Sequence, residues 1–389
     1  MCKQRRVKCD ECRPKCGNCA WREHRCSYPP SPRPDVSSQV DTSRALSPSR
    51  SDLDTRLMQH YLSHTGDTYA RLLYNVPEQA AVWTSVLPAA AFQVKAASHA
   101  LMALSAWCLD SHRDESDRSG PDYRAIAERH YSHALTLLQP ILNVLDEATA
   151  GSALATIMLL GACGVAKMRG RDDLSAISEW LHHIRAFMAV KATLPYLPSA
   201  GYGAMGVVLR ASIPYDRSEW VKADTTAPPG QSKLFQSMRE TWHIALQRIS
   251  AAIGTTHPPP NPHTTEAYHR ALALLHDVYE YLLAHIPWNR FRATFHWAAQ
   301  LPTLFAQLLT RGDALASVIY AHWLVCILLL RNRWWVGEMG ANGIRRVAAG
   351  IRAAGGTLGG LLEWPEEMVR RSVEDQRAGL FALGSVDAL

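Results

Sequence analysis

The cysteines of this chain are concentrated at one end. Six of the nine lie within the first 26 residues, in the stretch MCKQRRVKCDECRPKCGNCAWREHRC. This stretch is rich in lysine and arginine and lacks the apolar run of a secretory signal, so we expect the chain to stay in a reducing compartment. Clustered thiolates in such a compartment hold metal more often than they form disulfides. The sequence therefore predicts a small metal-held module at the N-terminus.

The spacing of these cysteines forms two near-copies of one pattern. Cys16-x2-Cys19-x6-Cys26 follows a stretch in which Cys2-x6-Cys9 repeats the second interval. If the repeat is continued towards the N-terminus, it predicts another cysteine three positions before Cys2. Two tetrahedral zinc ions need about eight ligand positions, which six thiolates supply when two of them bridge both ions. The expected bridges are Cys16 and the missing cysteine, so its absence leaves each ion one ligand short.

Two accounts of the missing ligand stay open. In the preferred account, a short segment upstream of the first residue carries the cysteine that the repeat expects. In the other account, Cys12 moves in as a substitute ligand. Cys12 lies in the loop between the two halves of the repeat, off the pattern, and an ordinary loop cysteine is the simpler interpretation.

The pattern CKQRRVKCDECRPKCGNC......C.Y resembles the fungal Zn2Cys6 binuclear-cluster transcription factors. The resemblance covers residues 1–28 and implies a nuclear protein that regulates genes of RNA polymerase II. It also implies a module in which each half is a short helix followed by an extended strand, and in which the first helix reads CGG-type triplets in the major groove of double-stranded DNA. The ligands of its two zinc ions would be Cys2, Cys9, Cys16, Cys19 and Cys26.

Charge is concentrated on the same module. Residues 1–30 carry eight basic and three acidic side chains, a net charge of +5, whereas the whole chain carries +6. Such a concentration is typical of a nucleic-acid binder, although a solvated face or a nuclear-import signal would look similar. By position in the resemblance, two arginines are expected to contact base edges, since a guanidinium fork fits guanine. Lysines are expected to contact phosphates and fix the register. The base-edge candidates are Arg5 and Arg6, and the phosphate candidates are Lys3, Lys8 and Lys15.

A linker is predicted at residues 29–56. Proline and serine make up 12 of the 24 residues from Pro29 to Asp52, and few apolar side chains separate them. Such a segment cannot bury enough surface to offset its chain entropy, so we expect it to be extended and mobile. It contains no apolar heptads, and a coiled coil directly after the cluster is therefore not expected.

Residues 57–389 are predicted to form a large all-α region. Apolar side chains such as Leu57, Met58, Tyr61 and Leu62 recur at helical spacing, and alternating strand patterns are scarce. Proline and glycine concentrate in residues 192–234, which suggests a division into two lobes. A second break, GTTHPPPNPHTTE, is predicted to be a loop.

Two long uncharged runs are apolar enough to raise the question of a membrane span. The runs Ala148–Ala166 and Ala314–Leu330 contain glycine, hydroxyl or histidine side chains, and the second is short of the roughly 20 residues that a spanning helix needs. We interpret both as buried core helices and expect no membrane span.

The helical region shows none of the common catalytic motifs, such as G-x-S-x-G, a P-loop, H-E-x-x-H or a dinucleotide glycine fingerprint. An enzyme is therefore not expected. Two histidine pairs have the spacing of a shared helix face, but surface or capping roles are the preferred interpretation. They are His60 with His64, and His130 with His133. The cysteines outside the cluster have apolar neighbours and are predicted to be small buried hydrophobes: Cys108, Cys163 and Cys326.

A second resemblance concerns the start of the helical region. LMQHYLSHTGDTYARLLYNVP followed by HALMALSAWCLD is similar to the regulatory domain of fungal sterol-uptake-control-type regulators. The resemblance implies a helical bundle that can form a homodimer and, in some members, binds an apolar small-molecule effector. The preferred interpretation is a zinc-cluster transcription regulator with a helical regulatory domain. The alternative is a ligand-sensing or protein-interaction protein that has lost DNA binding.

Overall fold

The structure is a computed structural model that describes residues 50–73, 80–113, 120–169, 175–193, 232–255, 261–283, 290–355 and 357–380. All of them belong to one unit, Arg50–Leu389. The described residues form helices and turns and contain no strand, which confirms the predicted all-α class for this unit. The predicted zinc module and most of the predicted linker lie outside the described residues, as does most of the proline- and glycine-rich stretch 192–234.

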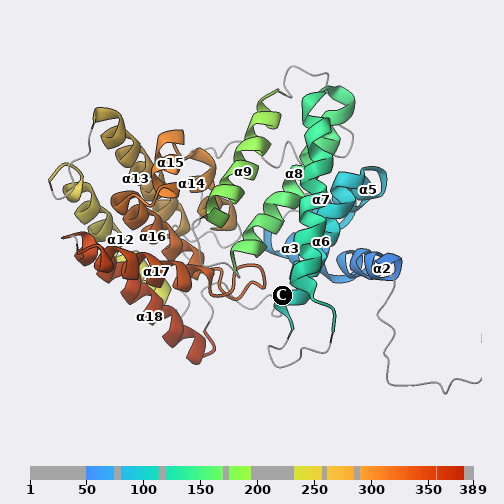
Figure 1. Ribbon diagram of the computed structural model, residues 1–389. Helices are drawn as coiled ribbons and strands as arrows, with labels where there is room; N and C mark the ends of the chain where they lie inside the picture. Colours follow the sequence, from blue (N-terminus) through green and yellow to red (C-terminus); the bar gives the residue numbers. More distant parts are fainter. Residues whose placement is uncertain are drawn as a thin grey trace, which may run out of the picture. The chain divides into compact units, whose positions relative to one another are not determined.

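The first half of the unit is built around one central helix. Helix α6 contacts α2, the π-helical turn η1, α5, α7 and α8, and Figure 1 shows α2, α5, α7 and α8 beside it. Alanines with leucine and tryptophan occupy its buried positions, so neighbouring helices approach it closely on several sides. The elements of this half are α2 (Arg50–His60), η1 (Tyr61–Thr65), α3 (Gly66–Leu73), the π-helical turn η2 (Val82–Val86), α5 (Leu87–Gln93), α6 (Lys95–Ser111), α7 (Tyr123–Asn143), α8 (Glu147–Met168) and α9 (Ser175–Thr193).

The second half of the unit is also built around one central helix, α16. This helix contacts α13, α14, α15, α17, α18 and the 3-10 helix η5, and every residue from Leu315 to Leu328 is buried. A helix that is apolar on all sides belongs in the middle of a core. The elements are α12 (Lys233–Ala252), α13 (Pro262–Leu283), α14 (Arg290–Gln300), α15 (Thr303–Thr310), α16 (Ala314–Leu328), α17 (Met339–Ala353), η5 (Thr357–Leu362) and α18 (Glu363–Arg377).

Aromatic side chains join the two halves. Trp180 of α9 stacks on Trp323 of α16, with ring centroids 6.1 Å apart, and meets Phe295 of α14 edge to face. Tyr69 of α3 stacks on Trp335, which precedes α17, at 5.5 Å. Aromatic pairs of this kind add about 0.5–1.5 kcal/mol beyond the area that they bury. The two halves therefore share one continuous core.

The two long uncharged runs are core helices, as predicted. Thr149–Met168 of α8 is apolar and long enough to cross a membrane, but 72% of it is buried inside the protein. Among the described residues, α15 and α16 would qualify only together, and they are bent by 99°. Both runs are covered by other helices of the same chain, so their apolar character is explained by the core.

Two predicted boundaries differ from the structure. Helix α2 begins at Arg50, so residues 50–56, expected in the linker, are helical because Leu53 and Leu57 are buried in the core. The predicted loop GTTHPPPNPHTTE is shorter than expected, because its last residues open α13. There the side chain of Asn261 accepts a hydrogen bond from the backbone N–H of Thr264 at 2.9 Å, and Pro262 occupies the first helical position.

Candidate functional site

The site residues predicted from the sequence fall at the N-terminus, outside the described residues. These are the zinc ligands, the alternative ligand Cys12 and the DNA contacts: Cys2, Cys9, Cys16, Cys19, Cys26, Lys3, Arg5, Arg6, Lys8 and Lys15. Their roles stay predictions. The described residues offer other candidates, which are a groove on the surface, a charged network and clusters of histidine and cysteine.

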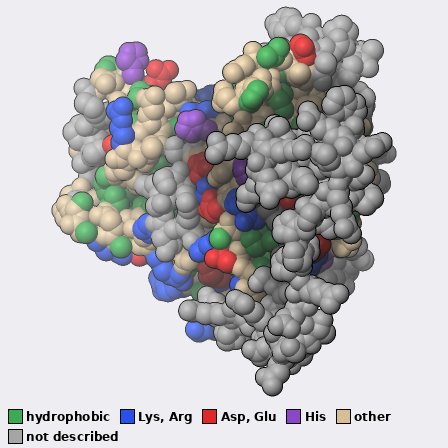
Figure 2. Space-filling view, turned by 45° about the vertical axis from the view of Figure 1, so that its right-hand side comes forward, with side chains coloured by type: hydrophobic (Ala, Val, Ile, Leu, Met, Phe, Trp, Pro, Cys, Tyr) green, Lys and Arg blue, Asp and Glu red, His purple; other side chains and the backbone are tan. Residues whose placement is uncertain are grey.

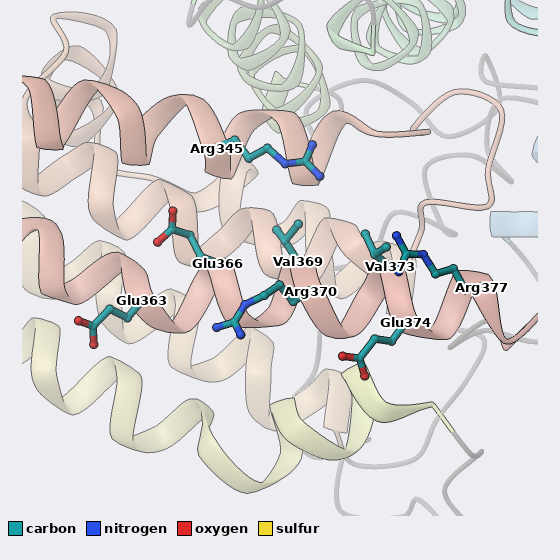
Figure 3. Close-up of a pocket in the computed structure, with 8 residues that line it drawn as sticks. All are labelled: Arg345, Glu363, Glu366, Val369, Arg370, Val373, Glu374 and Arg377. Carbon is teal, nitrogen blue, oxygen red and sulfur yellow. The ribbon is translucent and has the colours of Figure 1, made fainter.

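The groove lies between α17 and α18. Its volume is about 690 Å³, within the range of roughly 300–1,000 Å³ that small-molecule sites have. Figure 3 shows Glu366, Val369 and Val373 pointing from α18 towards α17, which carries Arg345. The groove therefore has an apolar strip with charged side chains on both sides. Sequence reasoning missed it, although the i, i+4 alternation of acidic and basic residues in EWPEEMVRRSVEDQR marks a solvent-facing helix.

The acidic side chains of the groove are already engaged. Arg352 donates two hydrogen bonds to the Glu366 carboxylate, and Lys233 Nζ lies 3.1 Å from Glu374 Oε2. The hydrogen bonds of Arg352 hold the pKa of Glu366 below its ordinary value. A general acid needs the opposite shift. Glu366 therefore lacks the environment of a general acid.

Charged side chains of both signs are mixed on the described part of the face that Figure 2 shows. In Figure 2 the basic and acidic side chains of the described residues lie next to one another on the face in view. This arrangement is typical of a solvated protein surface, whereas a DNA-binding face concentrates basic side chains.

A charged network centred on the buried Lys167 lies between α7, α8 and α9. Lys167 Nζ lies 3.3 Å from Glu128 Oε2 and 2.9 Å from Glu179 Oε2, and it sits 4.6 Å from the centre of the Tyr131 ring. Tyr131 also hydrogen-bonds His183. Desolvation raises the pKa of Glu179, but the hydrogen bond and charge of Lys167 outweigh it and leave that pKa lowered. The network links side chains of three helices.

Only some of the histidines in the two predicted pairs lie at the surface. His64 and His133 are exposed, as predicted, but His130 is 1% exposed, so the surface interpretation is wrong for this residue. Its Nδ1 lies 2.9 Å from Nδ1 of His99, and its Nε2 lies 3.3 Å from Asp54 Oδ1. Burial lowers the pKa of His130 to about 4, against the attraction of Asp54. His130 is buried because helices α2, α6 and α7 meet around it.

The other predicted pair lies side by side. The rings of His60 and His64 have centroids 5.4 Å apart, and His60 Nδ1 lies 2.9 Å from Thr65 Oγ1. Burial lowers the pKa of His60 to about 4, and the neighbouring imidazoles His64 and His112 add to this shift.

The three described cysteines are buried, as predicted: Cys108, Cys163 and Cys326. Burial raises the pKa of the Cys108 and Cys326 thiols to about 12 and that of Cys163 above its ordinary value as well. A thiol becomes a nucleophile only as the thiolate. None of the three therefore has the environment of a catalytic nucleophile.

Comparisons with known proteins bear on the first half of the unit. Residues 56–197 match the model of the fungal specific transcription factor domain. The match runs from within α2 to just beyond α9 and includes the charged network. The chain is also 28% identical over 206 residues to the Zn(2)-C6 fungal-type transcription factor afumD of Aspergillus fumigatus. The aligned part is 49% of this chain and 52% of the relative, so the chain spans about half the length of that relative. Both similarities support a transcription regulator of fungal type and point away from an enzyme.

Proposed function

We propose that this protein is a nuclear, sequence-specific DNA-binding regulator of RNA polymerase II genes. The observation that carries the proposal is the match of residues 56–197 to the fungal specific transcription factor domain. The cysteine spacing of residues 1–28 supports it independently, because that pattern lies outside the matched range.

In this proposal the N-terminal module holds two zinc ions and reads CGG-type triplets. Cys2, Cys9, Cys16, Cys19 and Cys26 are the proposed ligands, together with a cysteine three positions before Cys2 or with Cys12. The spacing of the cysteines and the net charge of +5 in residues 1–30 support this assignment. Cysteine-rich zinc modules of this size fold only with metal, so zinc and DNA binding are expected to be lost together.

The helical region, residues 57–389 in the predicted division, is the proposed regulatory and effector domain, joined to the module by the linker 29–56. Its first half carries the domain match, and its two halves share one core. A homodimer through this domain and an apolar small-molecule effector are parts of the proposal. Sedimentation of the purified chain tests the first. A thermal shift with a sterol and lipid panel tests the second, because a ligand that binds only the folded state raises the melting temperature.

The proposal is tested by selecting duplexes from a random library with the purified chain and with a form that carries one cysteine added three residues before Cys2. We expect enrichment of CGG-type triplets by the form whose cluster is complete, and loss of that enrichment in Cys19→Ser. The matched control is Cys326→Ser, which changes a buried cysteine of the helical unit. Zinc content and helicity are measured in parallel.

A zinc-loaded, helical protein that enriches no sequence would contradict DNA reading. That outcome would favour the second candidate function, a helical protein that acts through ligands or protein partners without contacting DNA.

A further inference from the structure

Three ligand-type side chains from two elements meet at the end of α6. They are His64 in η1, Cys108 in the last turns of α6 and His112, which caps this helix. Their ligand atoms all lie within 4.8 Å of one another. The Cys108 sulfur is 3.8 Å from His112 Nδ1, and the rings of His64 and His112 have centroids 5.8 Å apart. Ligand atoms around one tetrahedral zinc lie roughly 3.5 Å apart, as bonds of about 2.0–2.3 Å require. Separations of up to 4.8 Å would have to shorten by side-chain rotation when a metal binds.

The backbone at His64 is unusual in a way that serves this arrangement. Residues Tyr61–Thr65 form a π-helical turn, which places Tyr61 and Thr65 in the interior and leaves His64 at the surface. Single π turns inside helices occur frequently at functional sites. Gly66 follows directly, and a Cβ at this position would lie 3.0 Å from the carbonyl oxygen of Trp83. The turn is therefore closely packed where it brings His64 to α6.

We propose that His64, Cys108 and His112 bind one zinc ion, with water as the fourth ligand. Two imidazoles and one thiolate are donors that suit zinc, a borderline-soft ion. The imidazole nitrogen beside the sulfur, His112 Nδ1, also lies 2.8 Å from the Cys108 carbonyl oxygen, so binding a metal through this nitrogen would replace that contact. The proposal is independent of the proposed function.

Binding involves the loss of one proton. Burial raises the pKa of the Cys108 thiol to about 12, while a hydrogen bond from Thr65 acts in the opposite direction. Zinc replaces the proton on sulfur, the S–H bond breaks, a Zn–S bond forms and the proton passes to water. Zinc binding at this site therefore releases one proton.

A second group of ligand-type residues provides a contrast. His276, Asp277 and Glu280 also lie close together, but all three come from one stretch of α13, two of them are exposed and the group lacks sulfur. His276 and Glu280 form an i, i+4 pair at 3.9 Å on this helix. Exposed groups of this kind are common without metal. His276 is consequently a matched control.

The proposed site adjoins the contact between the two halves. The rings of His112 and Trp334 have centroids 6.5 Å apart, and Trp334 Nε1 donates to Thr68 Oγ1 at 3.2 Å. A zinc ion that fixes His112 to η1 would hold this junction together. Zinc should therefore stabilise the helical unit by mass action.

The test uses the full chain after removal of the N-terminal thiols, so that only the helical unit can supply sulfur ligands. In this background serine replaces Cys2, Cys9, Cys12, Cys16, Cys19 and Cys26. Cobalt(II) is the probe, because a thiolate ligand gives a charge-transfer band and tetrahedral coordination gives intense visible bands. We expect one cobalt per chain with both features, displacement by zinc, and a rise in melting temperature on addition of zinc.

Three variants and one control separate this site from weak surface binding. Cys108→Ser should abolish the charge-transfer band, and His64→Ala or His112→Ala should weaken binding at least tenfold. His276→Ala should leave binding unchanged. His64 and His112 are exposed, so their variants should fold even if Cys108→Ser does not. Absence of the thiolate band in the background chain, or its persistence in Cys108→Ser, would overturn the proposal. Neither result would bear on DNA reading, because the N-terminal thiols are absent throughout.

Discussion

Lys167 Nζ lies 2.9 Å from Glu179 Oε2, and this ion pair joins α8 to α9 inside the region that matches the transcription factor domain. The lysine side chain is 7% exposed, whereas Glu179 and the second partner, Glu128, are 31% and 35% exposed. One buried cation thus balances two carboxylates that retain some contact with water. We expect the stability of the three-helix contact to depend on this balance.

Replacing Lys167 by methionine should destabilise the protein by about 2–4 kcal/mol. The change keeps most of the side-chain volume but leaves two neighbouring carboxylates without their common cation. Breaking a fully buried pair costs about 3–5 kcal/mol, and partial exposure of the carboxylates reduces this figure. Urea unfolding measures the difference.

Lys233→Met is the matched control, because Lys233 pairs with Glu374 at 3.1 Å while both side chains are exposed. Its effect should stay within about 0.5 kcal/mol. Equal effects of the two substitutions would mean that the Lys167 network does not hold the helices together.

Glycines of α17 provide a second prediction, about close packing on α16. A Cβ on Gly340 would lie 3.0 Å from the carbonyl oxygen of Leu324. This oxygen belongs to the backbone of α16, so it cannot move aside as a flexible side chain could. Gly340→Ala should therefore destabilise the protein by about 1–3 kcal/mol. Thermal and urea unfolding measure the change.

Gly350→Ala on the same helix is the control. A Cβ there meets nothing within 4 Å, so alanine should raise stability by up to about 1 kcal/mol through its higher helix propensity. If both substitutions raised the stability, α17 would not approach α16 as closely at Gly340 as the structure shows.

The sequence predicted the helical core well and its local irregularities poorly. An apolar run such as Ala314–Leu328 identifies a buried helix, because no other environment in a folded domain satisfies it. The helical spacing also placed Leu57 and Tyr61 in the core, but it grouped Leu62 with them, and Leu62 is 50% exposed. The π-helical turn η1 changes the register there, and periodicity gives no signal of such a turn.

The histidine and cysteine clusters show a different limit of prediction from the sequence. Cys108 and His112 are four residues apart on one helix, a spacing that is readable in the sequence. His64 joins them from an earlier element, because η1 packs against α6. Likewise, His130 is buried because it meets His99 and Asp54 of two other helices. Such contacts depend on the tertiary arrangement, which the spacing of one chain segment does not specify.

The pH dependence of stability is the third prediction, and it concerns His322. This histidine lies in α16, donates from Nδ1 to the Val318 carbonyl at 2.9 Å and stacks on Trp364. Burial lowers its pKa from 6.5 to about 4. The unfolded chain binds the proton near pH 6.5, whereas the folded chain does not until about pH 4. The unfolded state therefore holds more protons in this window, and stability falls as the pH falls through it.

The contribution of His322 to this loss is about 3–4 kcal/mol at most, since its pKa is lowered by about 2.5 and one pKa unit corresponds to about 1.4 kcal/mol. His322→Leu removes the group that takes up the proton on unfolding. Urea unfolding at pH 7 and pH 4.5 should show a smaller acid loss in the variant than in the original chain. Identical losses would mean that His322 is not kept neutral by burial.

The last prediction separates reading of DNA sequence from attachment to DNA. With the zinc cluster complete, Arg5→Ala or Arg6→Ala should cost about 1–3 kcal/mol and relax the preference within one triplet, because a bidentate contact to a base is lost. Lys15→Ala should weaken binding to all sequences alike and lower the slope of log K against log salt by about one unit, because one phosphate contact is lost. Both effects are measured on duplexes with every base varied in turn, at several salt concentrations.

Lys95→Ala is the control for a simple loss of charge, since Lys95 is an exposed lysine at the start of α6 in the helical unit. It should change neither the preference nor the salt slope. A uniform loss of affinity in Arg5→Ala and Arg6→Ala, with the triplet preference unchanged, would show that these arginines contact phosphates. The base-reading side chains would then have to lie elsewhere in residues 1–28, and the less basic half that follows Cys19 would be the next segment to substitute.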